Sequence, residues 1–500
     1  MKIILYILLL INILYSSTLT MSISSSPSRV NPILANDSAS SDIAQWVFNG
    51  LFKYDKDGNV VVDLAESYEF KDDITLIVKL REDVLWHDGE KFSADDVIFT
   101  YNTIISPKIY TSITSLYRVV RNVEKIDQYT IKIKYKEPYF KALELWMTGI
   151  IPYHILKDDK DIMTSKFNKE PIGTGSYKLK SFKNSADIEL FANDDYFEGR
   201  PKIDKLLYKF RPDANTRFLM LKQKQLDMGR LSSLQLERQV DEEFKKEYRI
   251  IEQPDFSYTY LGLNNKNEKF KDIRVRKAIS LAIDRQEIIN IMSFGHARVC
   301  NGPFLPGTFA FNEDVKEPKY DLEQAKKLLK EAGYDENNPF SFELVTNSGS
   351  SNATYIAQII QFQLKHIGVN MKIRVMEWQA FLNTVIAPRK FESVLMAWSL
   401  SLTPDAYSIW HSDNQRKGGF NFIGYKNEEV DKLIKIGSKT VDRKKLSEIY
   451  KKIFKLITDD SPYIFLYIPN SITAVNKKIK NIEPALTGVF HNQKDWEIID

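Results

Sequence analysis

Two hydrophobic periods alternate along the chain and predict a mixture of strands and helices. Residues 74–80 and 129–135 alternate apolar and polar side chains, which is typical of strands with one buried face. Residues 19–24 alternate in the same way, and the Ser- and Pro-rich residues 24–31 predict a loop after them. In residues 41–52 apolar side chains recur at helical spacing, so we expect a helix there.

The second half of the chain is more regular. From about Asn264, strand and helix patterns follow one another in turn, which predicts βαβ units, a mostly parallel sheet and the α/β fold class. One helix has a signal at each end: Asp321 and Gln324 form an N-terminal cap signature, and Gly333 follows its last residue. The expected helices span residues 272–292, 321–332, 353–366, 379–386 and 443–457, and the expected strands span residues 341–346, 370–377, 393–398 and 464–468.

A chain of 500 residues is too long for one ordinary core, so two or three domains are expected. The patterns suggest two α/β lobes. One lobe is built from the N-terminal half and the last few tens of residues, and the other from the segment between them. Ligand in such proteins lies in the crevice between the lobes, and closure is a hinge motion.

The N-terminus predicts export. Met1 and Lys2 precede an apolar run over residues 3–15, and Ser16 and Ser17 supply the small residues of a cleavage site. This is the layout of a secretory signal peptide, and the run is shorter than the roughly 20 residues of a membrane span. An uncleaved N-terminal anchor is the alternative. No later stretch approaches the length of a membrane span.

The single cysteine bears on where the exported protein resides. Cys300 has no partner for an intramolecular disulfide, and it lies far from the signal, where a lipid-modified cysteine would follow the apolar run. Export without a lipid anchor suits the periplasm of a cell with two membranes, with secretion into the medium as the alternative.

The bulk composition excludes some classes of partner. A formal net charge of +4 is almost balanced and gives no support for nucleic-acid binding. Aromatic residues make up 12% of the chain, which large cores explain and which a cleft with aromatic walls would also explain.

Motifs for catalysis or metal binding are missing from the sequence. It contains no nucleophile elbow, no phosphate loop, no dinucleotide turn and no zinc-binding helix motif. Carboxylates are plentiful, but nothing singles out a glycosidase-like pair. We therefore expect no catalytic residue, no metal site and no cofactor. No two histidines have the spacing of a helical metal site; they are His87, His154, His296, His366, His411 and His491.

Residues 65–100 carry a family resemblance. They contain the string Ala-Glu-Ser at 65–67, Trp-His-Asp-Gly at 86–89 and Phe-Ser-Ala-Asp-Asp-Val at 92–97. This segment closely resembles the signature region of the family 5 extracellular solute-binding proteins, which serve ABC importers of oligopeptides, dipeptides and nickel. Physically it is a strand, a tight Asp-Gly turn and a capped helix, so we expect His87 to organise the turn and not to catalyse.

The resemblance continues along nearly the whole chain, at residues 171–177, 261–265, 274–285, 301–306 and 421–431. It implies a two-lobed periplasmic-binding-protein fold with an additional sub-domain in lobe I and two hinge strands, which we place near Asn264 and Pro469. It also implies a peptide ligand and permease subunits in the inner membrane as partners, and we expect a monomer. The expected parts are a signal peptide (1–17), lobe I (18–49, 171–263 and 470–500), its extra sub-domain (50–170) and lobe II (264–469).

The segment after Trp398 bears on the ligand. In the dipeptide and the well-known oligopeptide binders of this family, an Asp a few residues after this Trp holds the peptide's amino group. Here the corresponding residue is Ser401, and the first carboxylate is Asp405, which we expect to cap a helix. A serine would leave a buried ammonium poorly compensated, so a longer peptide that is not held by its amino terminus is the sharper expectation.

A receptor for varied peptides should pair with their backbone and offer roomy aromatic and amide-lined pockets. For the tryptophans among the candidates, core packing is an equally good interpretation. The predicted function is capture of oligopeptides for an ABC importer; the alternatives are a nickel chelate, haem or an oligosaccharide as ligand, and less favoured a periplasmic hydrolase or chaperone. The candidate ligand-binding residues are Trp46, Asn49, Trp378, Phe381, Trp398, Ser401, Phe420, Asn421 and Tyr425.

Overall fold

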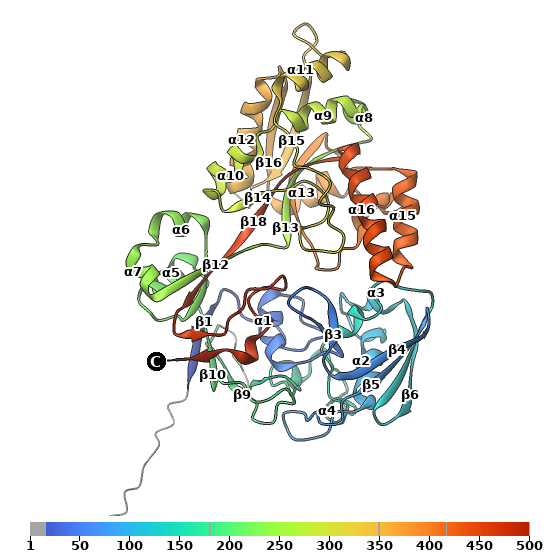
Figure 1. The fold of residues 1–500 in the computed structure, drawn as a ribbon, viewed down its shortest axis with the longest axis vertical. Helices are drawn as coiled ribbons and strands as arrows, with labels where there is room; N and C mark the ends of the chain where they lie inside the picture. The colour runs from blue at the N-terminus through green and yellow to red at the C-terminus, as the bar shows by residue number, and fades with distance from the viewer. Residues whose placement is uncertain (1–16, 180–181, 184, 349–350, 417, 500) are drawn as a thin grey trace, which may run out of the picture.

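The computed structural model describes residues 17–179, 182–183, 185–348, 351–416 and 418–499. The predicted signal peptide lies outside these residues except for Ser17, whose backbone amide donates to Asp204 Oδ2 at 2.8 Å. Two lobes are stacked along the long axis of the molecule (Figure 1), which confirms the predicted two-lobed α/β fold.

Lobe I is built on a four-stranded sheet in the order β1-β10-β9-β8, with β1 parallel to β10. Helix α1 begins at Ser38, capped by the Asp37 carboxylate, and not at residue 41 as its apolar spacing predicted. It buries Ile43, Trp46 and Val47 in the lobe I core. The elements are β1 (Thr18–Ile23), α1 (Ser38–Val47), β8 (Tyr177–Leu179), β9 (Ile188–Ala192) and β10 (Lys205–Phe210).

The sub-domain of lobe I contains an antiparallel sheet in the order β4-β5-β7-β6 and shares one continuous hydrophobic core with the rest of the lobe. Helix α2 is capped, as the sequence predicts, and the cap is a capping box between Ser93 and Asp96. The His87 ring bonds to the backbone of Gly173 and Gly175, so it joins the Asp-Gly turn to the loop at residues 171–177 instead of bonding within its own turn. The elements are β2 (Phe52–Tyr54), β3 (Val60–Val62), β4 (Ala65–Asp72), β5 (Thr75–Leu80), α2 (Ala94–Ile105), α3 (Thr114–Tyr117), β6 (Val120–Asp127), β7 (Thr130–Tyr135) and α4 (Tyr153–Leu156).

Two crossings connect the lobes (Figure 1), and both involve β18 (Tyr463–Asn476). Its first residues pair with β13 (Ser257–Leu263) of lobe II, and its last residues pair with β12 (Tyr248–Pro254) on the lobe I side. The strand expected over residues 464–468 is therefore one half of a longer strand that changes lobe at Pro469. The other crossing lies between β12 and β13 and not near Asn264, because the whole of β13 already belongs to the lobe II sheet.

Three helices and a short strand cover the lobe I end of β18 and form a small core of their own. Figure 1 shows these helices beside β12. The elements are α5 (Ala214–Lys222), β11 (Met228–Leu231), α6 (Ser233–Gln239) and α7 (Glu242–Glu247).

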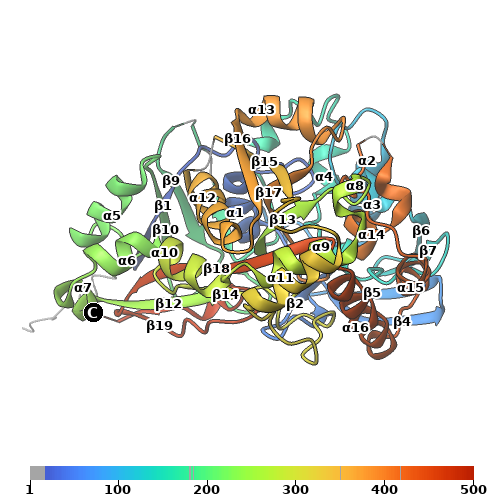
Figure 2. The same cartoon turned by 90° about the horizontal axis from the view of Figure 1, so that it is seen from above.

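Lobe II contains a sheet in which β15 is parallel to both β16 and β17, whereas β13 and β18 run antiparallel to their neighbours. The expected mostly parallel sheet is thus mixed, because the strands that cross between the lobes join it. Figure 2, seen from above, shows helices on both sides of these strands. The elements are α8 (Glu268–Lys271), α9 (Ile273–Leu281), α10 (Arg285–Ser293), β14 (Ala297–Val299), α11 (Leu322–Glu331), β15 (Ser341–Asn347), α12 (Ser351–Lys365), β16 (Asn370–Met376), α13 (Trp378–Phe381), β17 (Ser393–Ser399), α14 (Ala406–Trp410), α15 (Glu428–Ser438) and α16 (Arg443–Asp460).

One predicted helix of lobe II is wrong in detail. Residues 272–292 form two helices, since α9 ends at Leu281 and Asp284 caps a new helix by accepting from Glu287 N at 3.0 Å. After lobe II the chain returns to lobe I, where β19 (Ile479–Lys480) pairs with β20 (Glu497–Ile498).

Candidate functional site

A cavity of about 720 Å³ lies where the two lobes meet. Its floor is one face of the sheet formed by β11, β18 and β12. Arg230 lies opposite Thr473, and Gln253 opposite Ser471, and all four residues line the cavity. Because successive side chains of a strand point to opposite faces, the alternate lining residues Ser471 and Thr473 of β18 identify the face of the hinge sheet that is turned toward the cavity.

Lobe I supplies a second wall from the end of β1 and from α1. Residues 22–25, Asp42 and Gln45 line the cavity there. Ser24 and Ser25 form a bend directly after β1 and make no hydrogen bond within the described residues. Their peptide groups are free to pair with an extended chain.

The C-terminal return closes the cavity with residues 485–490. The Thr487 hydroxyl is shielded from solvent and has no hydrogen-bond partner among the described residues. A buried hydroxyl without a partner is costly, so a polar ligand is the natural complement of this wall.

Lobe II contributes the edge of its sheet where the parallel strands end. Open α/β sheets bind ligands at this carboxyl edge. Leu400, just after β17, donates its backbone N–H to Phe256 O at 2.7 Å, and Phe256 lines the cavity. This bond places the residue after β17 beside the cavity lining, but neither Trp398 nor any other of the nine predicted ligand-binding residues lines the cavity itself.

Some of the predicted ligand-binding residues lie together on this edge. Trp398 is half-buried, its ring lies 5.6 Å from that of Phe420, and Phe420 is 54% exposed. Trp378 follows β16 directly and is 40% exposed. Ser401 is also exposed, and its hydroxyl donates to Thr403 O at 2.6 Å. These aromatic and hydroxyl groups remain available for contact.

Two candidates from lobe I have structural partners instead. Trp46 is fully buried, and its Nε1 donates to Tyr208 Oη at 2.8 Å. The Asn49 amide donates to Asp63 at 3.0 Å and to Tyr196 at 3.2 Å. In this conformation Trp46 has no surface to offer a ligand, and the polar groups of Asn49 are used to join parts of lobe I.

Three candidates from lobe II are likewise held by the fold. Phe381 is fully buried in a lobe II core. The buried Asn421 side chain exchanges hydrogen bonds with the backbone of Tyr425 and donates to His411 O. The Tyr425 hydroxyl donates to Asp460 at 2.7 Å. The geometry thus favours core roles for these residues.

Asp405 caps a helix, as predicted. It precedes α14, and its Oδ1 accepts from Tyr407 N at 2.9 Å. Its Oδ2 accepts from the Ser408 hydroxyl at 3.0 Å. Both carboxylate oxygens are engaged, so the loop after Trp398 presents no free acid at this point.

The sequence did not identify the cavity residues on β11, on β12 or in residues 22–25. The Ser- and Pro-rich pattern of residues 24–31 predicts only a loop, and β11 is too short to give a periodic signal. The alternation of Met228 and Arg230 carries meaning only once β18 is known to lie beside it.

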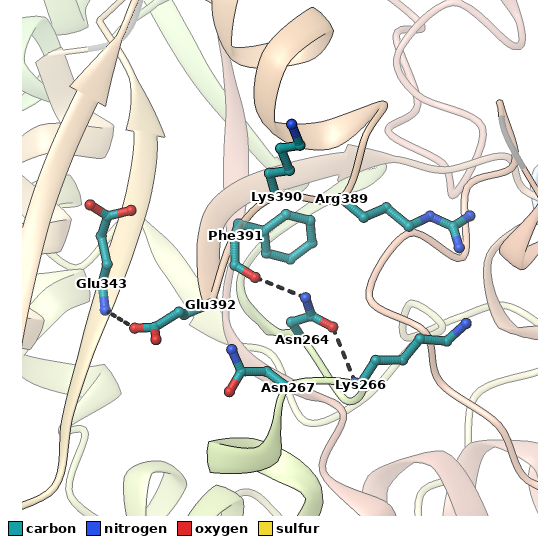
Figure 3. Close-up of a pocket in the computed structure, with 8 residues that line it drawn as sticks. All are labelled: Asn264, Lys266, Asn267, Glu343, Arg389, Lys390, Phe391 and Glu392. Carbon is teal, nitrogen blue, oxygen red and sulfur yellow. Dashed lines mark hydrogen bonds between the residues drawn. The ribbon is translucent and has the colours of Figure 1, made fainter.

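A second pocket, of about 650 Å³, lies at the opposite edge of the lobe II sheet (Figure 3). Its acids are already paired: Glu392 with Lys269 at 2.6 Å, and Glu343 with Arg374 at 2.9 Å. Lys266 and Arg389 extend away from these acids. The pocket lies at the amino ends of β15 and β17, far along the sheet from the interlobe cavity.

Two potentially reactive groups, Cys300 and His87, are buried, and neither lines the interlobe cavity. Burial raises the pKa of Cys300 to about 12, and burial lowers the pKa of His87 to about 4. Over the described residues, no group of three or more His, Cys, Asp or Glu is placed to hold a metal ion. Within the same part of the chain, no helix combines the length and apolar character needed to span a bilayer.

Known proteins resemble this chain along almost its full length. The model of the bacterial extracellular solute-binding proteins, family 5 (middle region), matches residues 59–420. The oligopeptide-binding protein AppA of Bacillus subtilis is 36% identical over 489 residues, which cover 94% of this chain and 89% of AppA. The glutathione-binding protein GsiB of Escherichia coli is 28% identical, over 90% of this chain and 88% of GsiB.

Solved structures are similar over the same extent. AppA of B. subtilis in complex with a nonapeptide has a TM-score of 0.76 and 35% identity, covering 97% of this chain and 99% of that one. NikZ from Campylobacter jejuni in complex with Ni(L-His) has a TM-score of 0.77 and 28% identity, covering 96% and 99%.

Proposed function

Because the chain belongs to family 5 of the bacterial extracellular solute-binding proteins, we propose that it captures oligopeptides in the interlobe cavity and delivers them to an ABC importer. The observation that carries the proposal is the free backbone of Ser24 and Ser25 on the cavity wall. An extended peptide pairs with such a backbone whatever its side chains are, which is how a receptor accepts many sequences.

The likeness to AppA, whose structure contains a nonapeptide, supports a peptide of several residues as the ligand. The local chemistry agrees with that length. Ser401 replaces an acid that would hold the amino terminus, and both carboxylate oxygens of Asp405 are used by α14. A peptide held along its backbone, and not by its amino terminus, is the better fit.

Of the nine residues that the sequence suggested, we retain Trp398, Phe420, Trp378 and Ser401 as ligand contacts. They lie at the carboxyl edge of the lobe II strands and keep exposed surface. The cavity residues of β11, β12 and β18 supply the opposite side.

We propose a biological setting that is supported by the family and by the pattern of the N-terminal sequence. The protein is exported by the segment at residues 1–17, acts in the periplasm as a monomer without a cofactor, and docks on permease subunits of the inner membrane. It binds its ligand without chemical change, so a peptide recovered from it is expected to be intact.

The likeness to NikZ makes a nickel chelate the second candidate ligand. One experiment separates the two. Protein expressed with its signal sequence is purified from the periplasm under native conditions, and the ligand released by denaturant is identified by mass spectrometry. A ladder of mixed, uncleaved peptides is expected.

A single metal complex, haem or an oligosaccharide would overturn the peptide proposal. Protein unfolded, washed and refolded before the release step is the control, because it has lost any ligand acquired in the cell. Incubating this protein with a synthetic peptide found in the ladder should restore the bound species and raise the melting temperature.

A further inference from the structure

Arg230 lines the interlobe cavity, and its guanidinium has no hydrogen-bond or ion-pair partner among the residues that the structure describes. It lies on the cavity face of β11, opposite Thr473. The other arginine of the lining, Arg217, donates to the carbonyls of Arg211 and Pro212 at 2.8 and 2.6 Å. Arg217 therefore supports a loop, whereas Arg230 is left with all of its donors.

The acids of the cavity do not neutralise Arg230 directly. Asp255 accepts from Phe256 N at 2.9 Å, within its own turn. Asp42 faces the same cavity and forms no ion pair with Arg230 among those the structure contains. Burial raises the pKa of Asp42, and the charge of Arg230 acts in the opposite direction, so the two groups lie within electrostatic reach without direct contact.

We propose that Arg230 recognises a carboxylate of the bound peptide, so that the cavity selects ligands by the position of an acidic group. The inference rests on the proposed peptide-binding function and goes beyond it. A guanidinium is always charged and matches a carboxylate with two parallel hydrogen bonds. The terminal carboxylate and an Asp or Glu side chain present the same chemistry, and the experiment distinguishes them.

The probe is a tryptic digest of casein, offered to ligand-free refolded protein. The retained peptide of highest affinity is then synthesised as the free acid, as the C-terminal amide, and with each Asp or Glu replaced by Asn or Gln. Dissociation constants are measured by calorimetry. We expect one neutralised form to bind the unaltered protein about tenfold more weakly than the free acid. The form that loses affinity identifies which carboxylate meets Arg230.

Variants assign that preference to Arg230. In Arg230→Met the difference between acid and neutralised forms should disappear, and in Arg230→Lys part of it should remain, because an ammonium lacks the planar fork. Asp42→Asn should enlarge the difference, since it removes a competing anion. Arg121→Met is the matched control: Arg121 is also an exposed strand arginine without a partner in the described residues, and it lies on β6, outside the cavity.

Two results would overturn the inference while the peptide function stands: equal binding of all neutralised forms by the unaltered protein, or an unchanged acid preference in Arg230→Met. Melting curves without ligand establish whether Arg230→Met is folded. If it is not, Arg230→Lys replaces it in the comparison, because lysine retains a long side chain and the positive charge. If the unaltered protein retains no peptide from the digest, the proposed function fails, and the inference fails with it. That outcome is seen before any variant is compared.

Discussion

The indole of Trp398 contacts both buried core residues and an exposed ring, so its removal should affect both stability and ligand binding. The ring stacks parallel to Tyr260 at a centroid distance of 6.3 Å, and Nε1 donates to Tyr463 at 3.2 Å. Of its other ring neighbours, Phe422 is buried and Phe420 is largely exposed. We expect Trp398→Ala to weaken peptide binding about tenfold and to lower the free energy of unfolding by about 2 kcal/mol, since the side chain is half-buried. Calorimetry and melting curves measure the two effects separately.

Phe420→Ala is the control for Trp398→Ala, because it removes an exposed ring from the same edge. It should weaken binding with little change in melting temperature. If Trp398→Ala lowers the melting temperature equally with and without peptide, Trp398 belongs to the core and not to the site.

At the scale of single residues, the sequence predicts the role of a side chain when its partner lies within a few residues along the chain. The caps at Ser93 and Asp405 involve side chains and amides two or three residues apart, and both are present. The role of Trp46 depends on Tyr208, which is 162 residues away in the chain. The partner of Tyr425 is Asp460, which is distant as well. No local pattern distinguishes such a buried aromatic residue from one that faces a ligand.

At the scale of elements, one histidine connects lobe II to the lobe I side of the hinge. His296, directly before β14, contacts α6 and β12. The His296 ring contacts Glu237 of α6 at 2.8 Å and Glu252 of β12 at 2.9 Å. Burial acts to lower the pKa of His296, but the hydrogen bonds to these glutamates outweigh it and raise the pKa above 6.5. The bridge is therefore strongest when His296 is protonated.

This bridge predicts a pH dependence. Because the folded pKa is raised, the stabilisation is fully present below the unfolded pKa of 6.5 and is lost as the pH rises through the folded pKa. Its size is at most about 1 kcal/mol, since Glu237 is largely exposed. Melting temperatures of the unaltered protein and of His296→Gln should differ at about pH 5.5 and converge near about pH 8.5.

His154→Gln is the matched control for His296→Gln. His154 pairs with Asp88 at 2.9 Å, but both residues belong to the lobe I sub-domain. Loss of the His296 bridge at about pH 5.5 should alter the opening of the lobes, measured by small-angle scattering with and without peptide, whereas His154→Gln should leave that opening unchanged. A melting difference for His296→Gln that is the same at both pH values would contradict the role of the protonated bridge.

Periodicity predicted most strands and helices of lobe II to within a few residues, as at α11, β15 and β17. It failed at β18 and at α9–α10, for two physical reasons. An apolar run does not reveal that a strand passes from one sheet to another. The side chain of Asp284 that starts a new helix competes with a helical pattern that continues through it.

At the scale of the whole molecule, the lobes also touch on the side away from the hinge. Glu144 of the sub-domain accepts from Arg443 at the start of α16 at 2.8 Å and from the Thr403 hydroxyl at 3.2 Å. Thr403 also contacts Tyr54 Oη at 3.0 Å. Thr403 lies in the loop after Trp398, so the loop that follows β17 of lobe II is itself attached to lobe I.

We name Glu144, Arg443, Thr403 and Tyr54 the interlobe latch and expect it to slow the release of peptide. The Glu144 side chain is only 9% exposed, so Arg443→Met leaves a buried carboxylate without its cation, which costs about 3 kcal/mol in the closed form. In an open form that carboxylate regains water, and the cost disappears. The variant should therefore favour opening and raise the dissociation rate of peptide about tenfold or more, measured by stopped-flow fluorescence, with a smaller effect on the association rate.

A second ion pair across the same interface provides the control. Lys439 and Glu137 lie 2.7 Å apart, but both side chains are 55% exposed. Solvent already screens this pair, so Lys439→Met should change the dissociation rate by less than about threefold. Each variant removes one cation from the lobe II side. A difference between their dissociation rates therefore reports the burial of the partner carboxylate and not the loss of a charge. Equal dissociation rates for Arg443→Met and the unaltered protein would mean that closure depends on the hinge and the ligand alone, and that the contacts of Glu144 only accompany it.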